Sequence, residues 1–246
     1  MTTLVDLGPV AQLRAGRLPR RLAQMTVGLI FYGISLGMLV AGTLGTAPWD
    51  VLHTGIATHV PLTLGQVLML ASIVVLMAFW PLREVPGVAT LANPVVLGLS
   101  ADATIWLLLD VVDVHDVVGD GALGWTVRVG LMVGGVVLCG FATALYIGAQ
   151  LGRGPRDGLM TGLSRRTGWS LRAVRTGIEV TVVLAGLALG GAAGVGTLVY
   201  ALAIGPLTQA MLPRWTVRLP GAAVAPPVVE AGVEAGVEAG VSAGSR

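Results

Sequence analysis

Two copies of one short polar motif carry the residues best placed for chemistry. The first copy reads G-T-A-P-W-D-V-L-H-T-G-I at 45–56, and the second reads G-R-G-P-R-D-G-L-M-T-G-L at 152–163. Proline suits the first turn of a helix, where a carboxylate is favoured by the helix dipole, and a threonine four residues later falls on the same face. An aspartate that only caps its helix would explain the pattern as well. The candidate solute-binding or coupling residues of this motif are Asp50, Thr54, Asp157 and Thr161.

A pair of opposite charges lies within a later apolar segment. Arg175 and Glu179 are four residues apart and can pair along one face of a helix. A charge inside a membrane costs about 2.5–3.5 kcal/mol on insertion scales, so an unneeded pair tends not to persist. The first copy has Leu68 and Ser72 at the matching positions. This asymmetry favours solute binding or proton exchange by the pair, and a salt bridge that fixes helix packing is the alternative.

Proline falls inside the third predicted helix of each copy, as Asn93-Pro94 and as Gly205-Pro206. Interrupted helices line the binding sites of many transporters, which makes Asn93 a further candidate, and a simple proline kink is the alternative. The histidines His53, His59 and His115 have no metal-ligand spacing and are expected to be solvated. The sequence contains no recognised catalytic or nucleotide-binding motif, so we predict no catalytic residue, no metal, no cofactor and no enzymatic activity.

The composition is that of an integral membrane protein. Of 246 residues, 54% are hydrophobic and only 11% are charged, against roughly a quarter in soluble domains. The mean hydropathy is +0.84. All fifteen basic residues are arginine, and they flank apolar segments, so nucleic acid is not an expected partner. The single cysteine, Cys139, excludes a disulfide within the chain.

Six segments are long and apolar enough to be predicted as membrane-spanning helices, since a span needs about 20 residues. They are 22–44, 63–82, 87–109, 128–150, 171–190 and 195–212. The motif copies lie between spans and are predicted to form short re-entrant or interfacial half-helices. We expect four regions: a basic cytoplasmic segment 1–21, a first three-helix repeat 22–112, a second repeat 126–213, and a disordered low-complexity tail 220–246.

An internal repeat organises these helices. Residues 45–102 align with 152–209 at a constant offset of 107 without a gap. Because each copy has three helices, an odd number, the second copy must be inverted in the membrane. Arginine placement agrees, since basic and arginine-free connections alternate along the chain and only Arg128 lies on the wrong side. The fold class predicted is therefore an all-α integral membrane protein of six helices in two inverted repeats, with both termini cytoplasmic.

The two motif copies, together with R-A-V-R-T-G-I-E at 172–179 and G-V-G-T-L-V-Y-A-L-A-I-G-P-L-T-Q at 194–209, resemble the YczE/YitT family of bacterial multipass membrane proteins. The similarity covers about residues 20–215 and is closer to the YczE side. It implies an architecture, and transport is often suspected for the family. It implies no established substrate.

These observations lead to one expected function and two alternatives. We expect a transporter or exporter of an unidentified small solute in the bacterial inner membrane, with the solute site between the inverted repeats. The alternatives are a non-transporting scaffold that binds a partner through the basic loop 152–172, and the substrate-binding membrane subunit of an ATPase-driven importer. The lipid bilayer is the expected surrounding, and a homodimer is left open.

Overall fold

In the computed structural model, residues 8–114, 116, 119, 121–152 and 154–219 are described, and all their secondary structure is helical. The predicted tail 220–246 and His115 lie outside these residues. The elements are α1 (Pro9–Arg14), α2 (Leu18–Gly42), α3 (Pro48–Ala57), α4 (Leu64–Met77), α5 (Phe79–Leu82), α6 (Val88–Ile105), the π-helical η1 (Trp106–Val111), α8 (Ala122–Gly148), α9 (Pro155–Thr167), α10 (Leu171–Ala188) and α11 (Val195–Trp215).

Each of the six predicted spans forms a helix, and five helical segments are long and apolar enough to cross a membrane. The five are α2, α4 with α5, α6 with η1, α8, and α11. The sixth, α10, has eighteen residues but carries Arg172, Arg175 and Glu179, which sets it apart from the others. Six spans therefore remain a prediction.

The predicted interruptions at proline are wrong. Pro94 lies inside a continuous α6, and Pro206 lies inside a continuous α11. A proline removes one N–H from the helix ladder, and a helix packed among neighbours can absorb that loss without ending. The predicted start of the first helix is also wrong, because α2 begins at Leu18 and not at residue 22.

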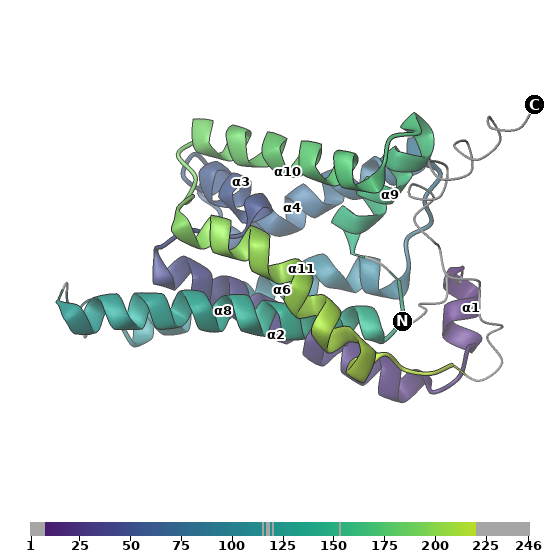
Figure 1. Ribbon diagram of the computed structural model, residues 1–246, viewed down its shortest axis with the longest axis horizontal. Helices are drawn as coiled ribbons and strands as arrows, with labels where there is room; N and C mark the ends of the chain where they lie inside the picture. The colour runs from purple at the N-terminus through teal and green to yellow at the C-terminus, as the bar shows by residue number, and fades with distance from the viewer. Residues whose placement is uncertain (1–7, 115, 117–118, 120, 153, 220–246) are drawn as a thin grey trace, which may run out of the picture.

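The long helices lie side by side along the longest axis of the molecule (Figure 1). At one end the start of α2 meets the ends of α8 and α11, because the Gln24 amide donates to the carbonyls of Leu145 and Trp215 at 2.9 and 2.7 Å. At the other end the start of α4 meets the end of α6, where Asp102 accepts from the Thr63 hydroxyl and the Gly65 N–H. Successive long helices therefore run in alternating directions.

The sequence repeat is visible in the helix starts. Three helices of the second copy begin 107 residues after their equivalents: α9 after α3, α10 after α4, and α11 after α6. Equivalent residues also start equivalent helices, since the hydroxyls of Thr63 and Ser170 cap α4 and α10. Both copies therefore form the same local structure.

Backbone hydrogen bonds exchanged in both directions join the two copies. The Gly196 N–H in α11 donates to the Leu44 carbonyl at 2.7 Å, and the equivalent Ala89 N–H in α6 donates to the Leu151 carbonyl at 2.9 Å. The turns that supply these carbonyls continue into Gly45 and Gly152, which both have φ +116°. The third helix of each copy thus packs on the turn of the other.

The short helices also pack across copies. The backbone of α3 at Val51 lies against Gly186 of α10, where an added Cβ would come within 2.5 Å of it. At the equivalent place in the other copy, the Phe79 ring lies against Gly158 of α9. The glycine is on the second helix in one contact and on the half-helix in the other, but the same two positions meet in both. Each half-helix is therefore held by the second helix of the opposite copy.

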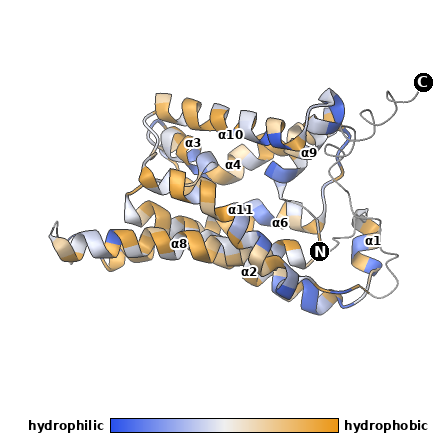
Figure 2. Ribbon diagram, in the orientation of Figure 1, coloured by the Kyte–Doolittle hydropathy of each residue, from blue (hydrophilic) through white to orange (hydrophobic). Residues whose placement is uncertain are grey.

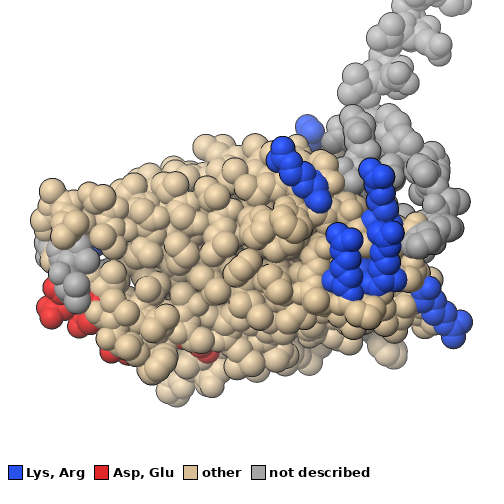
Figure 3. All heavy atoms as spheres, turned by 90° about the horizontal axis from the view of Figure 1, so that it is seen from below, with Lys and Arg blue, Asp and Glu red and all other residues tan. Residues whose placement is uncertain are grey.

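Polarity is distributed by end. Apolar residues run along the lengths of the long helices, and hydrophilic ones gather near α1, the start of α2 and α9 (Figure 2). The face seen in Figure 3 has its arginines at one end and its acidic side chains at the opposite end. The arginines belonging to the helix termini that meet at the basic end are Arg14, Arg17, Arg20, Arg21, Arg83, Arg165, Arg166, Arg172 and Arg214.

One of these arginines is structural. Arg21 is fully buried, and its guanidinium donates to the carbonyls of Gln12, Ala149 and Gln150 at 2.5, 2.8 and 2.5 Å. It therefore ties α1 and α2 to the end of α8. The sequence prediction had placed it in a cytoplasmic segment that precedes the first span.

The turn glycines give the first testable prediction. Gly45→Ala should destabilise the protein by about 2–4 kcal/mol, because alanine is strained at a positive φ and its Cβ would overlap a neighbour. That Cβ would lie 2.6 Å from the Gly194 nitrogen. Gly152→Ala should behave alike, with its Cβ 2.9 Å from the Gly87 Cα. Gly130→Ala, which meets nothing within 4 Å, is the matched control. Thermal unfolding in detergent measures all three, and wild-type stability in Gly45→Ala would disprove the interlocked turns.

Candidate functional site

A cavity of about 290 Å³ lies where the N-termini of α3 and α9 come together. Pro48 and Pro155, the first residues of the two half-helices, both line it. Its volume is at the lower end of the range for small-molecule sites. The other lining residues that matter below are Tyr32, Trp49, Asn93, Tyr146, Arg156, Asp157, Arg175, Glu179, Tyr200, Gly205, Thr208 and Gln209.

Two repeat-equivalent residues stack on one another beside the cavity. Trp49 and Arg156 occupy the same motif position in their copies, and the Arg156 guanidinium carbon lies 5.1 Å from the centre of the Trp49 ring. Such a cation–π contact is worth more when it is shielded from water. The two half-helices therefore meet through corresponding side chains.

Arg156 also reaches the aspartate of the other copy. Its Nη2 lies 3.4 Å from Asp50 Oδ1, and the same oxygen contacts His53 Nδ1 at 3.0 Å. Asp50 and His53 are each only 1% exposed. The expectation that His53 is solvated is therefore wrong, because it lies three residues after Asp50 on the buried face of α3. Asp50 does not line the cavity but holds the arginine that does.

The two predicted threonines bind backbone and not the cavity. Thr54 donates to the Asp50 carbonyl at 2.8 Å and accepts from the Ala192 N–H at 3.0 Å, which fastens α3 to the turn before α11. Thr161 donates to the Asp157 carbonyl at 2.6 Å within its own helix. Neither residue lines the cavity.

Asp157 and Asn93 come together at the cavity wall. The Tyr146 hydroxyl donates to Asp157 Oδ2 at 3.2 Å. A Cβ on Gly154 would lie 3.4 Å from each of those oxygens and 3.8 Å from Asn93 Nδ2, so the three polar groups surround one point. Asn93 is 8% exposed, and within the described chain its amide has no hydrogen-bond partner. Its polar atoms therefore face the cavity.

Arg175 and Glu179 form the α10 wall of the cavity. Arg175 Nε and Glu179 Oε1 are 2.9 Å apart, but the side chains remain 54% and 29% exposed. The pair was predicted to lie inside the membrane as a candidate solute-binding or coupling pair. In the structure both side chains line the cavity and are partly exposed.

Residues of both copies line the cavity, but the space it occupies beside α10 and α11 is filled at the equivalent positions of the first copy. Leu68, which matches Arg175, is 2% exposed and packs in a cluster with Leu36, Leu97 and Ala101. Similarly, a Cβ on Gly98 would meet Gly65 and Met69, whereas its equivalent, Gly205, has nothing within 4 Å. Side chains that differ between the copies therefore fill this space in the first copy and leave it open in the second.

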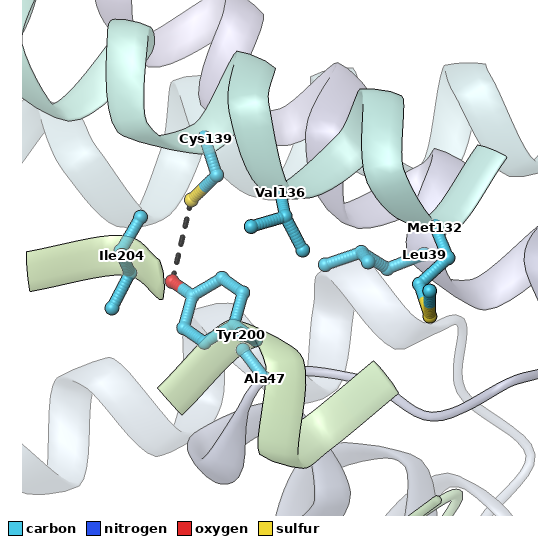
Figure 4. Packing of buried hydrophobic residues seen from close by; sticks show 7 residues of the cluster. All are labelled: Leu39, Ala47, Met132, Val136, Cys139, Tyr200 and Ile204. Atoms are coloured by element: carbon cyan, nitrogen blue, oxygen red, sulfur yellow. Dashed lines mark hydrogen bonds between the residues drawn. The ribbon is translucent and has the colours of Figure 1, made fainter. Parts of the chain in front are cut away.

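Aromatic residues complete the site, and sequence reasoning missed them. Tyr32 and Tyr146 stack with ring centres 6.2 Å apart. Tyr200, which is equivalent to Asn93, points its hydroxyl at Cys139 Sγ of α8, 3.3 Å away (Figure 4). Arg156 was also missed as a site residue, although the P-R-D triplet displayed it beside Asp157. No comparable local signal marks the tyrosines, because they come from separate helices.

Comparisons with known proteins show to which family the chain belongs. Residues 19–213 match the model of a family of unknown function, DUF6198. The chain belongs to this family. An uncharacterized protein of Haemophilus influenzae is 34% identical over 192 residues, which cover 76% of this chain and 83% of that protein. The uncharacterized membrane protein YczE of Bacillus subtilis is 31% identical over 200 residues, covering 80% and 87%. No solved structure matches.

A more distant relative, the uncharacterized protein YyaS of Bacillus subtilis, is 24% identical over 191 residues, covering 76% of this chain and 90% of that protein. These matches confirm the resemblance to YczE. With its several long apolar helices, this DUF6198 protein is a membrane protein.

Substitution of the two motif aspartates should lower the stability of the protein by different amounts. Asp50→Asn should destabilise the protein by about 3–5 kcal/mol, since it removes the buried carboxylate that pairs with Arg156 and His53. Asp157→Asn should cost about 1 kcal/mol, because within the described residues a single hydroxyl donates to that carboxylate. Thermal unfolding of the two purified variants provides the comparison. Equal losses of stability would show that Asp157 is as structural as Asp50.

Proposed function

We propose that this protein transports a small solute across the bacterial inner membrane and binds it in the cavity between the two copies. The observation that carries the proposal is the meeting of two half-helix N-termini at one cavity. Each N-terminus presents the positive end of a helix dipole, and the start of α9 also presents free backbone N–H groups. Secondary transporters built from inverted repeats place their solute sites at such broken segments near the middle of the bilayer.

The proposed membrane orientation follows from the two ends of the molecule. Positively charged residues favour the cytoplasmic side, so the arginine-rich end faces the cytoplasm and the acidic end faces outward. The first residue of α2, Leu18, and the last residue of α11, Trp215, both lie at the basic end. With α10 as the sixth span, the two copies are inverted relative to one another and the half-helices are re-entrant. The Arg175–Glu179 pair then adjoins the cavity and not lipid alone.

The scaffold alternative is less well supported by the basic loop 152–172. Three of its arginines contact this chain's own groups: Arg156 contacts Asp50, Arg165 pairs with Glu84, and Arg166 donates to the Pro81 carbonyl at 2.6 Å. A membrane subunit driven by a separate ATPase would use the same cavity and remains the second candidate.

Loss of the cavity charge should abolish function. In a bacterial strain lacking the protein, small solutes in the cells and the medium are compared by mass spectrometry after complementation with wild type or variants. Arg156→Leu, at equal membrane levels, should lower transport at least ~10-fold, because a hydrogen bond to a charged group contributes about 1.5–3 kcal/mol. Arg128→Leu, which alters an arginine beside Trp125 at the start of α8, should restore the wild-type solute profile.

The second test variant replaces the α10 pair by its first-copy equivalents, Arg175→Leu with Glu179→Ser. Its stability should stay within about 1 kcal/mol of wild type, since partly exposed ion pairs contribute little. Its transport should be lost. If both cavity variants restore the wild-type solute profile, the cavity is not the solute site and the scaffold function is favoured.

A further inference from the structure

The cavity holds opposite charges side by side. Arg156 and Asp157 are consecutive at the start of α9, and both line it. On the facing wall Arg175 and Glu179 neutralise each other through their 2.9 Å contact. The lining side chains therefore have no net charge. In the described part of the chain, Arg156 and Asp157 form no ion pair with each other, so their charges are available to a solute.

The Arg156 side of the cavity suits an anionic group. Its guanidinium has five N–H donors, and within the described chain one hydrogen bond, to Asp50, is formed. Trp49, 9% exposed, has an indole Nε1–H without a partner among the described residues. The free N–H groups at the start of α9, a helix of 13 residues, lie at the same place. A carboxylate could accept from the guanidinium and from these backbone N–H groups at once.

The Asp157 side suits a cationic donor. Its carboxylate receives one hydrogen bond, from Tyr146, and an ionised carboxylate has about four acceptor sites. The Asn93 amide lies beside it, with Nδ2 near the same point as the carboxylate oxygen. An ammonium group with three N–H donors could donate to the free acceptor sites of Asp157. A solute bearing only an anionic group would bring its charge close to Asp157, which would repel it.

The remainder of the wall is aromatic and apolar. Tyr32, Tyr146, Tyr200 and Ile204 line the cavity beyond the charged groups. We propose that the solute is a small zwitterion with adjacent carboxylate and amino groups and an apolar side chain, an amino acid of this kind, held by Arg156 on its carboxylate and by Asp157 on its ammonium. This inference rests on the proposed function and specifies its substrate class.

The test uses probes that differ by one charge. Thermal unfolding of the purified full-length protein in detergent is followed with leucine, phenylalanine and methionine. The first two are compared with their amines, isopentylamine and phenethylamine, and with their acids, 4-methylpentanoate and 3-phenylpropanoate. At least one amino acid should raise Tm in a concentration-dependent way, because a ligand that binds the folded state stabilises it. The single-charge analogues should not raise Tm.

Variants then assign the two charges. Asp157→Asn should weaken binding of the stabilising amino acid at least ~10-fold, and Arg156→Leu should do the same, since each loses a charge-assisted hydrogen bond. Arg128→Leu should bind as wild type does. The zwitterion proposal is overturned if an amine or acid stabilises as well as its amino acid, if no amino acid stabilises, or if Asp157→Asn binds normally.

These outcomes can be separated from failure of the transport function. The comparison of cellular and medium solutes assumes no chemical class. If the transported solute depends on Arg156 but lacks one of the two charges, the transport proposal stands and the zwitterion proposal fails. Unchanged solute profiles in both cavity variants would exclude transport itself.

Discussion

The hydrogen bonds from Gly196 to Leu44 and from Ala89 to Leu151 fix the geometry on which the rest of the structure depends. Each lets the third helix of one copy rest directly on the turn of the other copy. That approach needs a turn with φ near +116°, which only glycine adopts without strain. With the turns interlocked, α3 and α9 both begin beside the same cavity and run away from each other. The site is thus a product of how the copies join, more than of any single helix.

Within this symmetric frame, a few side chains make the two halves different. Leu68 is packed in a hydrophobic cluster, but Arg175, its equivalent, lines the open cavity. Trp49 and Arg156 are equivalent as well, yet one supplies an aromatic face and the other a charge that stacks on it. A duplicated fold can in this way retain its architecture while its two copies supply different groups to one site.

Much of the architecture could be predicted from the sequence. The constant offset of 107 placed equivalent helices correctly, and Pro48 and Pro155 marked the half-helix starts, because proline and local capping act within a few residues. The candidate site was less predictable. Asp50 and Asp157 look equivalent in sequence, but packing buries one under His53 and leaves the other at the cavity. Contacts between distant segments, such as Tyr146 with Asp157, have no local signal. Proline was misleading, because continuous helices accommodate it.

The central claim is that the cavity between the two copies is open to water along α10, at positions whose first-copy equivalents are packed. Substituted-cysteine labelling tests it most directly, using Glu179→Cys and its equivalent Ser72→Cys in inside-out membrane vesicles with a charged, membrane-impermeant thiol reagent. The wild-type chain is the control, because Cys139 is fully buried. Ser72 is 7% exposed and should be protected, whereas cysteine at 179 should react rapidly. Equal reactivity at the two positions, or reaction at 72 alone, would contradict the asymmetric cavity.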